Sequence, residues 1–290
     1  MKILILGSSG LLGGQIFEHL NSYKKLKILH NGLKFRKYNL TCKYQLEELL
    51  IKSNADLIIN CSGITNIDYC EREKSVSYEL NVILVKKIFN LKKKFKLKFI
   101  FIQFSTDQIY DSKKIIRNKE RLKLKINNEY SKQKSAQEKI CLENKSLILR
   151  TNFFGRSYNK KQSFSDWIFK SFSDNKEFCL FKDVYFNPLR IDTICKIIKN
   201  IIIKKKFKIK GIYNLGSRGF MSKSEFAIYF AKKNKIYKKN YLLREINSIL
   251  KVKRSKNMIM DVNKFEDKFN IRLPNIQNEI INETRKYLND

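Results

Sequence analysis

Residues 2–13 read KILILGSSGLLG, and this stretch decides the fold. It opens with an apolar run of the kind that is buried on both faces of a parallel sheet. The glycines that follow, Gly7, Gly10 and Gly13, have the spacing of a phosphate-binding turn, and residues 15–20 read as helix. A strand, a glycine-rich turn and a helix N-terminus predict a dinucleotide site. The glycines permit close backbone approach, and the helix end offers N–H donors to a pyrophosphate.

Strands and helices alternate beyond this stretch. The apolar pattern predicts further strands at 26–30, 56–60, 98–104 and 146–150, and helices at 44–52, 71–94 and around Tyr130. This alternation predicts an α/β protein with a Rossmann-type, doubly wound parallel sheet. From Thr151 the pattern loosens. We expect helices at 163–174, from Asn187-Pro188 to about Lys204, from Ser222, and on both sides of Leu273-Pro274, with a short strand at 211–216.

The change in pattern suggests two regions. Residues 1–152 are predicted to form an NAD(P)-binding Rossmann domain, with a returning segment at about 187–215. Residues 153–186 and 216–290 are predicted to form a smaller C-terminal α/β region that binds the substrate. The basic segment 112–126 contains no Gly or Pro that would mark a turn, and the sequence does not indicate a role for it.

The bulk composition is that of a soluble globular protein. The chain has 290 residues, of which 43% are hydrophobic and 30% charged. No apolar run reaches the roughly 18 to 20 residues that span a bilayer. Gly7 and the residues after it interrupt the N-terminal apolar run too early for a signal peptide. We therefore expect a cytoplasmic protein with no membrane partner.

The formal net charge of +34 raises the question of nucleic-acid binding. Lys, Ile, Asn, Phe and Tyr are all abundant, while Gly and Pro number only 10 and 2, a joint bias typical of an AT-rich coding sequence. The lysines are spread along the chain, and no recognition motif for DNA or RNA is present. We predict no nucleic-acid partner, and we expect the charge to attract anionic substrates.

The cysteines and histidines do not predict a metal site. None of the six cysteines has a C-x-x-C partner, and the only histidines are His19 and His30. A structural zinc site or a disulfide framework needs closer spacing or more ligands. We therefore expect reduced thiols, most of them buried, and no metal.

Small and hydroxyl side chains follow two predicted strands. Cys61-Ser62-Gly63 follows one strand and would let a cofactor lie across the sheet edge. Ser105-Thr106-Asp107 follows the next strand and would face the ligand, although such a cluster can equally cap a turn.

The end of the second strand bears on cofactor choice. An acidic residue there would hold the ribose 2′-hydroxyl of NAD, but His30 and Asn31 occupy this place, with Lys34 and Arg36 close behind. This favours NADPH, with NADH left open. His30 could equally be a surface residue with no role.

Tyr130 and Lys134 form the candidate catalytic pair. If residues 127–140 are helical, their side chains share one face. A cationic Lys beside a phenol favours the phenolate and brings the Tyr pKa toward the range useful for acid–base catalysis. In a chain rich in both residue types, a Tyr and a Lys at this spacing also occur by chance. The surrounding motifs therefore decide whether this pair is catalytic.

Taken together, the motifs resemble the extended short-chain dehydrogenase/reductase superfamily, and within it the dTDP-4-dehydrorhamnose reductase family. The resemblance runs nearly end to end. It rests on the segments Gly7 to Gly13, 59–63, Ser105-Thr106-Asp107, Tyr130 with Lys134, 150–155, Asn187-Pro188, 260–264 and 271–274.

The resemblance implies an NAD(P)H-dependent oxidoreductase that reduces a nucleotide-linked 4-keto-6-deoxy sugar, as in dTDP-rhamnose and polysaccharide biosynthesis. It implies that Tyr130 protonates the C4 oxygen as hydride arrives, that Lys134 lowers the Tyr pKa and binds the nicotinamide ribose, and that Thr106 orients the substrate oxygen. The predicted cofactor-binding residues are Gly7, Gly10, Leu11, Leu12, Gly13, His30, Asn39, Cys61, Ser62, Gly63, Tyr130 and Lys134. The predicted substrate-binding residues are Ser105, Thr106, Asp107, Asn152, Phe153, Trp167, Asn187 and Arg254.

Departures from the family pattern leave specificity open. Ser131 occupies the position after the Tyr where the family often has Gly. The family also has an Arg-Pro-x-Asn segment, which in this chain reads Arg254-Ser255-Lys256-Asn257. The sugar, the nucleotide and the oligomeric state stay undetermined, with a homodimer among the options. A sugar-nucleotide epimerase or dehydratase with bound NAD⁺ is one alternative. A non-catalytic regulatory subunit on the same fold is another.

Overall fold

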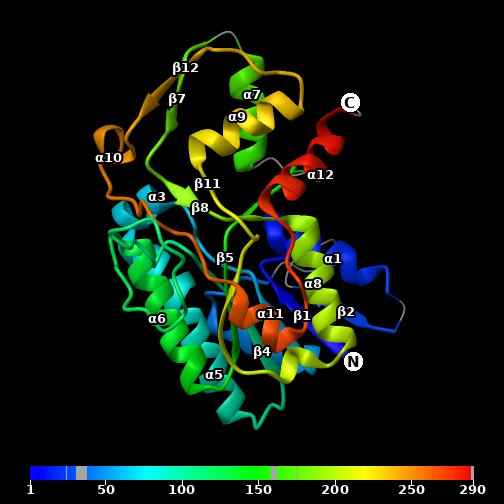
Figure 1. Ribbon diagram of the computed structural model, residues 1–290. Coiled ribbons are helices and arrows are strands. Elements are labelled where there is room, and N and C mark those ends of the chain that lie inside the picture. Colours follow the sequence, from blue (N-terminus) through cyan, green and yellow to red (C-terminus); the bar gives the residue numbers. More distant parts are fainter. Residues whose placement is uncertain (24, 31–37, 158–161, 175, 289–290) are drawn as a thin grey trace. The chain divides into compact units, whose positions relative to one another are not determined.

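A computed structural model describes residues 1–23, 25–30, 38–157, 162–174 and 176–288 (Figure 1). Its strands are β1 (Lys2–Leu6), β2 (Lys27–His30), β3 (Leu57–Asn60), β4 (Ile100–Thr106), β5 (Leu147–Thr151), β6 (Phe153–Phe154), β7 (Phe178–Phe181), β8 (Tyr185–Phe186), β9 (Leu189–Arg190), β10 (Gly211–Leu215), β11 (Met221–Ser222) and β12 (Tyr241–Arg244).

The α-helices are α1 (Leu11–Asn21), α2 (Lys43–Ser53), α3 (Ile67–Arg72), α4 (Lys74–Tyr78), α5 (Leu84–Lys94), α6 (Glu129–Glu143), α7 (Phe164–Ser173), α8 (Ile191–Ile203), α9 (Lys223–Lys233), α10 (Ile246–Ile249), α11 (Asn263–Phe269) and α12 (Ile276–Leu288). A π-helix, η1 (Glu79–Ile83), joins α4 to α5, and a 3₁₀-helix, η2 (Lys206–Lys208), follows α8.

The chain divides into two compact units. Unit 1 contains Met1–Thr106, Asn128–Leu149 and Cys195–Tyr213, and unit 2 contains Asp107–Asn127, Arg150–Ile194 and Asn214–Asp290. The predicted boundaries differ from this division chiefly at 107–127, which packs with unit 2 rather than with the N-terminal domain. The assignment of cofactor binding to one region and substrate binding to the other stays a prediction.

Unit 1 is built on a six-stranded sheet with the order β10-β5-β4-β3-β1-β2. β1 pairs in parallel with both β2 and β3, and β3 pairs in parallel with β4. Parallel neighbours need crossover connections, which the intervening helices provide. The predicted fold class, an α/β doubly wound parallel sheet, is confirmed.

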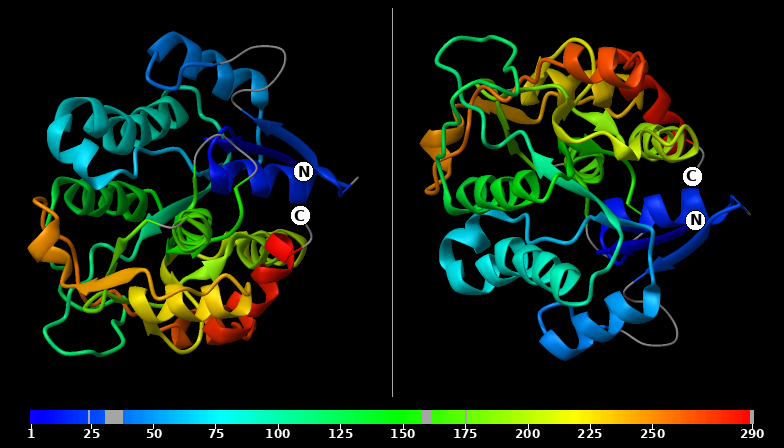
Figure 2. Two further views of the ribbon diagram at one scale, coloured as in Figure 1. Left: turned by 90° about the horizontal axis from the view of Figure 1, so that it is seen from above. Right: turned by 90° about the horizontal axis from the view of Figure 1, so that it is seen from below.

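Helices cover both faces of this sheet. On one face, Leu4, Ile58 and Phe101 pack in one apolar cluster with residues of α2, α5 and α6. Alternate strand residues such as Ile3 and Ile59 are equally buried but belong to the other face. Figures 1 and 2 show α1 and α8 on that side of the strands. Burial on both faces explains why these strands read as continuous apolar runs.

Unit 2 has its own apolar core. α7, α9 and α12 pack together around aromatic side chains, among them Phe154, Phe172, Phe226 and Phe230 (Figure 1). Three two-stranded sheets, β11-β8, β12-β7 and β6-β9, border this core. The sequence did not predict these short pairs, because strands of two to four residues carry little periodicity of their own.

Segment 107–127 joins this unit through Asn118. The main-chain N–H of Asn118 donates to the carbonyl of Ile259 at 2.7 Å, and its side-chain amide donates to the same oxygen at 2.8 Å. The Asn214 amide in turn donates to the Asn118 carbonyl at 2.8 Å. These partners lie far away in the sequence, which is why the segment could not be placed from sequence alone.

Candidate active site

The glycine-rich turn packs directly against the end of β3. Gly7 has φ of +78°, a left-handed conformation that favours glycine, and a Cβ there would lie 2.6 Å from the Ser62 nitrogen. A Cβ on Gly13 would overlap the Gly7 carbonyl. The Gly10 N–H donates to the Gly7 oxygen at 3.0 Å and closes the turn, and Gly10 is the N-cap of α1. The structure thus joins two of the predicted cofactor-binding segments, with Leu11 and Leu12 in the first turn of α1.

Buried amides hold the end of β3 in place. The Asn60 side-chain oxygen accepts from the Ser62 N–H at 3.1 Å and from the Ser62 hydroxyl at 2.5 Å. The Asn60 amide donates to Gln103 on β4 at 2.8 Å. The turn that carries Ser62 is therefore fixed to the neighbouring strand by hydrogen bonds away from water, where an unpaired amide would be costly.

The π-helix η1 places Asn81 beside the same turn. Asn81 is fully buried, and its side chain accepts from the Ile64 N–H at 2.8 Å and donates to the Ile64 carbonyl at 3.0 Å. It also donates to Gln133 of α6 at 2.8 Å, and the amide of Gln137 donates to the Asn81 carbonyl at 2.6 Å. One residue thus ties the carboxyl end of β3 to α6, and π-turns of this kind occur frequently at functional sites.

Side chains accept hydrogen bonds from several main-chain N–H groups in the first turn of α6. Asn128 and Ser131 form a capping box, with the Asn128 side chain accepting from the Ser131 N–H at 3.0 Å. The Glu71 carboxylate accepts from the Glu129 N–H at 3.0 Å. Ser131, which departs from the family pattern, therefore has a structural role at the start of the helix that carries Tyr130.

Lys134 is buried and points toward the end of β4. Its ammonium donates to the Phe104 carbonyl at 2.8 Å and to the Gln137 side chain at 2.5 Å. Burial lowers the pKa of Lys134 to about 8, while Glu138, Cys141 and Cys61 act in the opposite direction. A lysine in this state is close to its titration point at neutral to mildly basic pH.

Thr106, Tyr130 and Lys134 all belong to unit 1. Tyr130 lies one helical turn before Lys134 on α6, and both side chains are 6% exposed. Thr106, at the end of β4, is 5% exposed, and the preceding Ser105 donates to the Glu138 carboxylate at 2.6 Å. The bonds from Lys134 and Ser105 fasten α6 to the end of β4, which brings the predicted catalytic residues into one region.

Cys61, another predicted cofactor-binding residue, also has a shifted pKa. Burial and the neighbouring Cys195 raise the pKa of the Cys61 thiol above its usual range, and Lys134 opposes them. The thiol is therefore neutral, which agrees with a packing role rather than a nucleophilic one.

Two other predicted cofactor residues lie elsewhere in unit 1. His30 ends β2, and its ring meets that of Phe17 edge-on at 4.6 Å. The Asn39 side-chain oxygen accepts from the main-chain N–H and the hydroxyl of Thr41, at 3.0 and 2.8 Å, and so caps a turn before α2. Their part in cofactor binding stays a prediction, and Asn31, Lys34 and Arg36 lie outside the described residues.

In unit 2, Asp107 and Asn152 are direct partners. The Asn152 amide donates to the Asp107 carboxylate at 2.6 Å. Asp107 also favours the charged form of Lys223, whereas Arg254 disfavours it, so these charges lie close to one another. Two of the predicted substrate-binding residues, Asp107 and Arg254, therefore interact electrostatically with a lysine that the sequence did not identify, and Asn152 bonds to Asp107.

Lys223 lines a pocket together with Trp167, the only Trp of the chain. This pocket of about 210 Å³ is lined by Phe164, Trp167, Lys223 and three residues of β7. The ammonium lies 5.7 Å from the centre of the Phe164 ring, and burial lowers the pKa of Lys223 below its usual value. Lys223 is the first residue of α9, where a cation is disfavoured by the helix dipole. That mismatch is the sequence signal that could have identified it.

Phe153 and Asn187 are two further predicted substrate-binding residues of unit 2. Phe153 belongs to β6 and pairs with Leu189. Asn187 is buried, its amide donates to the carbonyls of Ser217 and Met260, and its side-chain oxygen accepts from the Met260 N–H at 2.9 Å. The Asn187 side chain is thus used in holding the fold together, and its predicted contact with substrate stays a prediction.

Within the described part of the chain, no group of three or more His, Cys, Asp or Glu residues could hold a metal ion. All six cysteines are free thiols. Among the helices of the described residues, none is long and apolar enough to cross a lipid bilayer.

Comparisons with known proteins agree with this fold. A dTDP-4-dehydrorhamnose reductase from Aggregatibacter actinomycetemcomitans is 24% identical over 283 residues, covering 93% of this chain and 94% of the relative. A crystal structure of dTDP-4-dehydrorhamnose reductase from Bacillus anthracis in complex with NADP is similar with a TM-score of 0.86 at 20% identity, covering 98% of each chain. A hypothetical dTDP-4-dehydrorhamnose reductase from Sulfolobus tokodaii is similar with a TM-score of 0.78 at 25% identity, covering 92% of this chain and 94% of the other.

The family comparison spans almost the entire sequence. The model of the family described as RmlD substrate binding domain matches residues 1–288. The resemblance inferred from the spacing of the motifs is thereby confirmed at the level of the family. The chain belongs to the RmlD substrate binding domain family.

Proposed function

We propose that this protein is an NAD(P)H-dependent reductase of a nucleotide-linked 4-keto-6-deoxy sugar. The observation that carries the proposal is the attachment of α6 to the end of β4, where the Lys134 ammonium donates to the Phe104 carbonyl at 2.8 Å. This bond gathers Thr106, Tyr130 and Lys134 in one region next to a glycine-rich turn. The dTDP-4-dehydrorhamnose reductases that the chain resembles give the substrate class.

The residues of unit 1 fit a dinucleotide. At Gly7 and Gly13 a Cβ would collide with the backbone, so the turn packs tightly at the N-terminus of α1, where a pyrophosphate would bind. When bound, the cofactor would supply the hydride. NADPH is the proposed form because β2 ends without an acidic residue, and the similar Bacillus anthracis reductase was solved with NADP.

Tyr130, Lys134 and Thr106 would handle the proton. Tyr130 would donate its phenolic proton to the substrate oxygen as the hydride arrives at the carbonyl carbon. Lys134, one helical turn away, would stabilise the phenolate that remains and would bind the nicotinamide ribose. Thr106 would orient the substrate oxygen through a hydrogen bond.

Residues of unit 2 would hold the substrate. Lys223 and Arg254 offer two cations near Asp107, and a diphosphate is the part of a nucleotide sugar that such cations recognise. Trp167 and Phe164 line the pocket at Lys223 and offer aromatic faces to a base or a sugar. We therefore assign Lys223 to the substrate-binding residues together with Asp107, Asn152, Trp167 and Arg254.

A reductase assay tests the proposal. The protein would be incubated with a panel of nucleotide-linked 4-keto-6-deoxy sugars, and loss of reduced nicotinamide absorbance would be followed with NADPH and with NADH. We expect substrate-dependent oxidation of NADPH, and we expect the Tyr130→Phe variant to remain folded but to lose about 10² to 10⁴-fold in kcat. Wild-type turnover by Tyr130→Phe would contradict the role of this residue.

The same assay separates the two alternatives. A sugar-nucleotide epimerase or dehydratase would be purified with bound NAD⁺ and would convert its substrate without net consumption of cofactor. A non-catalytic regulatory subunit would bind the cofactor, show no turnover on any keto sugar and retain a partner protein in a pull-down.

A further inference from the structure

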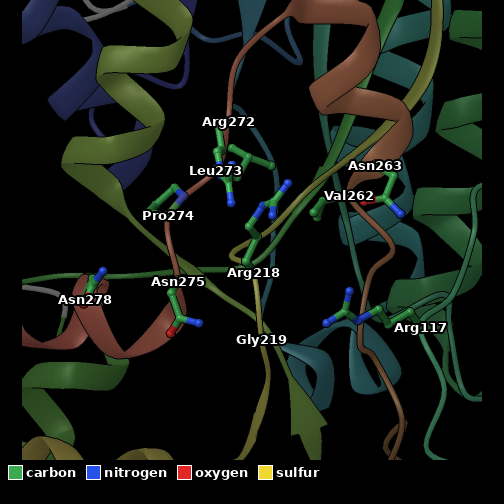
Figure 3. Close-up of a pocket in the computed structure, with 10 residues that line it drawn as sticks. All are labelled: Arg117, Arg218, Gly219, Val262, Asn263, Arg272, Leu273, Pro274, Asn275 and Asn278. Carbon is green, nitrogen blue, oxygen red and sulfur yellow. The ribbon is translucent and has the colours of Figure 1, made fainter.

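Unit 2 contains a second and larger pocket, away from the Lys223 group. Its volume is about 770 Å³, within the range of pockets that bind small molecules. Figure 3 shows the residues that line it: Arg117, Arg218, Gly219, Val262, Asn263, Arg272, Leu273, Pro274, Asn275 and Asn278. Three of these residues are arginines and none is acidic. Arginine is much scarcer than lysine in this chain, so the general lysine richness does not explain the cluster.

Arg218 is fixed at the centre of the pocket wall. Its guanidinium forms a two-pronged ion pair with Glu266, whose carboxylate also accepts from the Leu273 N–H at 2.6 Å. The Arg218 main chain runs beside the start of α12, since its N–H donates to the Pro274 carbonyl at 2.8 Å and its carbonyl accepts from the Ile276 N–H at 2.9 Å. This backbone is therefore held in place before any ligand arrives.

Among the residues that the structure describes, neither Arg272 nor Arg117 forms an ion pair within 4 Å. In Figure 3 the Arg272 and Arg218 side chains extend toward one another. Glu266 is the carboxylate that both approach, and although burial would raise its pKa, hydrogen bonds from Arg218 and Leu273 and the charge of Arg272 hold that pKa below its usual value. Arg117, from segment 107–127, is exposed and makes no hydrogen bond or ion pair with any other residue that the structure describes.

Polar groups near the guanidiniums complete the lining. The Asn275 side chain accepts from the Gln277 N–H at 2.9 Å in the first turn of α12, a helix of 13 residues whose N-terminus carries partial positive charge. Asp261 is a second carboxylate near the pocket, and it accepts a hydrogen bond from the Asn263 N–H at 3.0 Å. Val262, Leu273 and Pro274 supply an apolar part.

We infer that this pocket binds a phosphate-bearing ligand, with Arg117, Arg218 and Arg272 as its anion ligands. Guanidinium groups match phosphate oxygens with paired hydrogen bonds, and two guanidiniums that face one another are stabilised by an anion between them. The volume and the apolar part favour a diphosphate-bearing molecule of about nucleotide size over a single inorganic ion. The site is distinct from the Lys223 pocket, with which it shares no lining residue.

Calorimetric titration with inorganic pyrophosphate tests the inference on the full-length protein. The experiment compares wild type with an Arg117→Gln/Arg272→Gln double variant at about 0.15 M salt, where weak surface attraction is largely screened. Arg218 is left unchanged, because its removal would strand the Glu266 carboxylate. The matched control is Arg244→Gln, an exposed arginine of β12 outside the pocket.

We expect wild type and Arg244→Gln to bind pyrophosphate alike, and the double variant to lose one binding event or to weaken it at least tenfold. Pyrophosphate bound elsewhere, for example at the glycine-rich turn, would remain in all three proteins and would not hide this difference. The inference is overturned if wild type shows no binding, if the double variant titrates like wild type, or if Arg244→Gln weakens binding as much as the double variant does.

Discussion

The Lys134 ammonium donates a hydrogen bond of 2.8 Å to the Phe104 carbonyl, and this bond joins α6 to the end of β4. The bond between Ser105 and Glu138 lies one turn further along the same helix. Together they determine where Tyr130 lies relative to Thr106, so that the candidate proton donor depends on the strand as much as on its own helix.

The state of Lys134 leads to a prediction about pH. Burial lowers the pKa of Lys134 to about 8, so its ammonium loses charge above that pH in the folded protein. If Lys134 binds the cofactor as a cation, the dissociation constant for NADPH should rise above pH 8 by up to about tenfold per pH unit. Fluorescence titration of NADPH between pH 6.5 and 9.5 measures this. A dissociation constant that stays flat up to pH 9.5 would contradict it.

The effect of Lys134 on stability has the opposite sign. Between pH of about 8 and the usual lysine value near 10.4, the unfolded chain binds more protons at this position than the folded chain. The contribution of Lys134 to the free energy of unfolding therefore increases with pH across that window. Weaker NADPH binding in this pH range would therefore not be caused by a loss of stability from the titration of Lys134.

Gly13→Ala should abolish cofactor binding. The added Cβ would overlap the Gly7 carbonyl and push the turn off the end of β3, at a cost of about 1–3 kcal/mol in stability. The control is Gly14→Ala, where the nearest atom is the Ser8 carbonyl oxygen at 3.1 Å and a small shift accommodates the methyl group. NADPH titration and thermal unfolding compare the two variants. Equal NADPH affinity in both would show that the turn does not hold the cofactor.

Asn81→Ala should destabilise unit 1 through loss of hydrogen bonds. It would leave the Ile64 N–H and the Gln133 side-chain oxygen without their present partners in a buried region, at about 1–3 kcal/mol for each group. Asn144→Ala, which removes one exposed bond to the Ile140 carbonyl, should cost less than about 0.5 kcal/mol. Denaturant unfolding measures both. A similar small loss in the two variants would mean that Asn81 is not the tie between β3 and α6.

Lys223→Met should weaken substrate binding and leave the chemical step intact. A hydrogen bond to a charged group contributes about 1.5–3 kcal/mol, so KM for the nucleotide sugar should rise about ten- to a hundred-fold at nearly constant kcat. The protein should remain folded, because Lys223 is only half-buried and its charge partner Asp107 keeps the hydrogen bond from Asn152. Lys232→Met, on the exposed side of the same helix, is the control. An unchanged KM in Lys223→Met would remove this residue from the substrate site.

The central sheet could be predicted from the sequence because its strands are continuous apolar runs. The strand expected at 56–60 is Leu57–Asn60, and the helix expected at 163–174 is Phe164–Ser173. Such elements are encoded locally by apolar periodicity and by caps such as Ser163 and Ser222. The helix expected from Ser222 begins there, with a capping box between Ser222 and Glu225.

The features that sequence could not give depend on contacts between distant residues. Segment 107–127 is placed by Asn118 and its partners Asn214 and Ile259. The π-turn at Asn81 follows from bonds to Ile64, Gln133 and Gln137 on other elements. Lys223 was missed because, in a lysine-rich chain, the local sequence does not distinguish one lysine from another. Its position at the start of a helix is the one exception.

Transfer of deuterium from the cofactor tests the central claim most directly. NADPH carrying deuterium at the reactive position of the nicotinamide would be incubated with the protein and a nucleotide-linked 4-keto-6-deoxy sugar, and the product would be examined by mass spectrometry and NMR. We predict one deuterium at C4 of the sugar for each NADPH oxidised, with the rate greatly reduced in Tyr130→Phe. A sugar product that forms without deuterium and without loss of NADPH would contradict the assignment as a reductase.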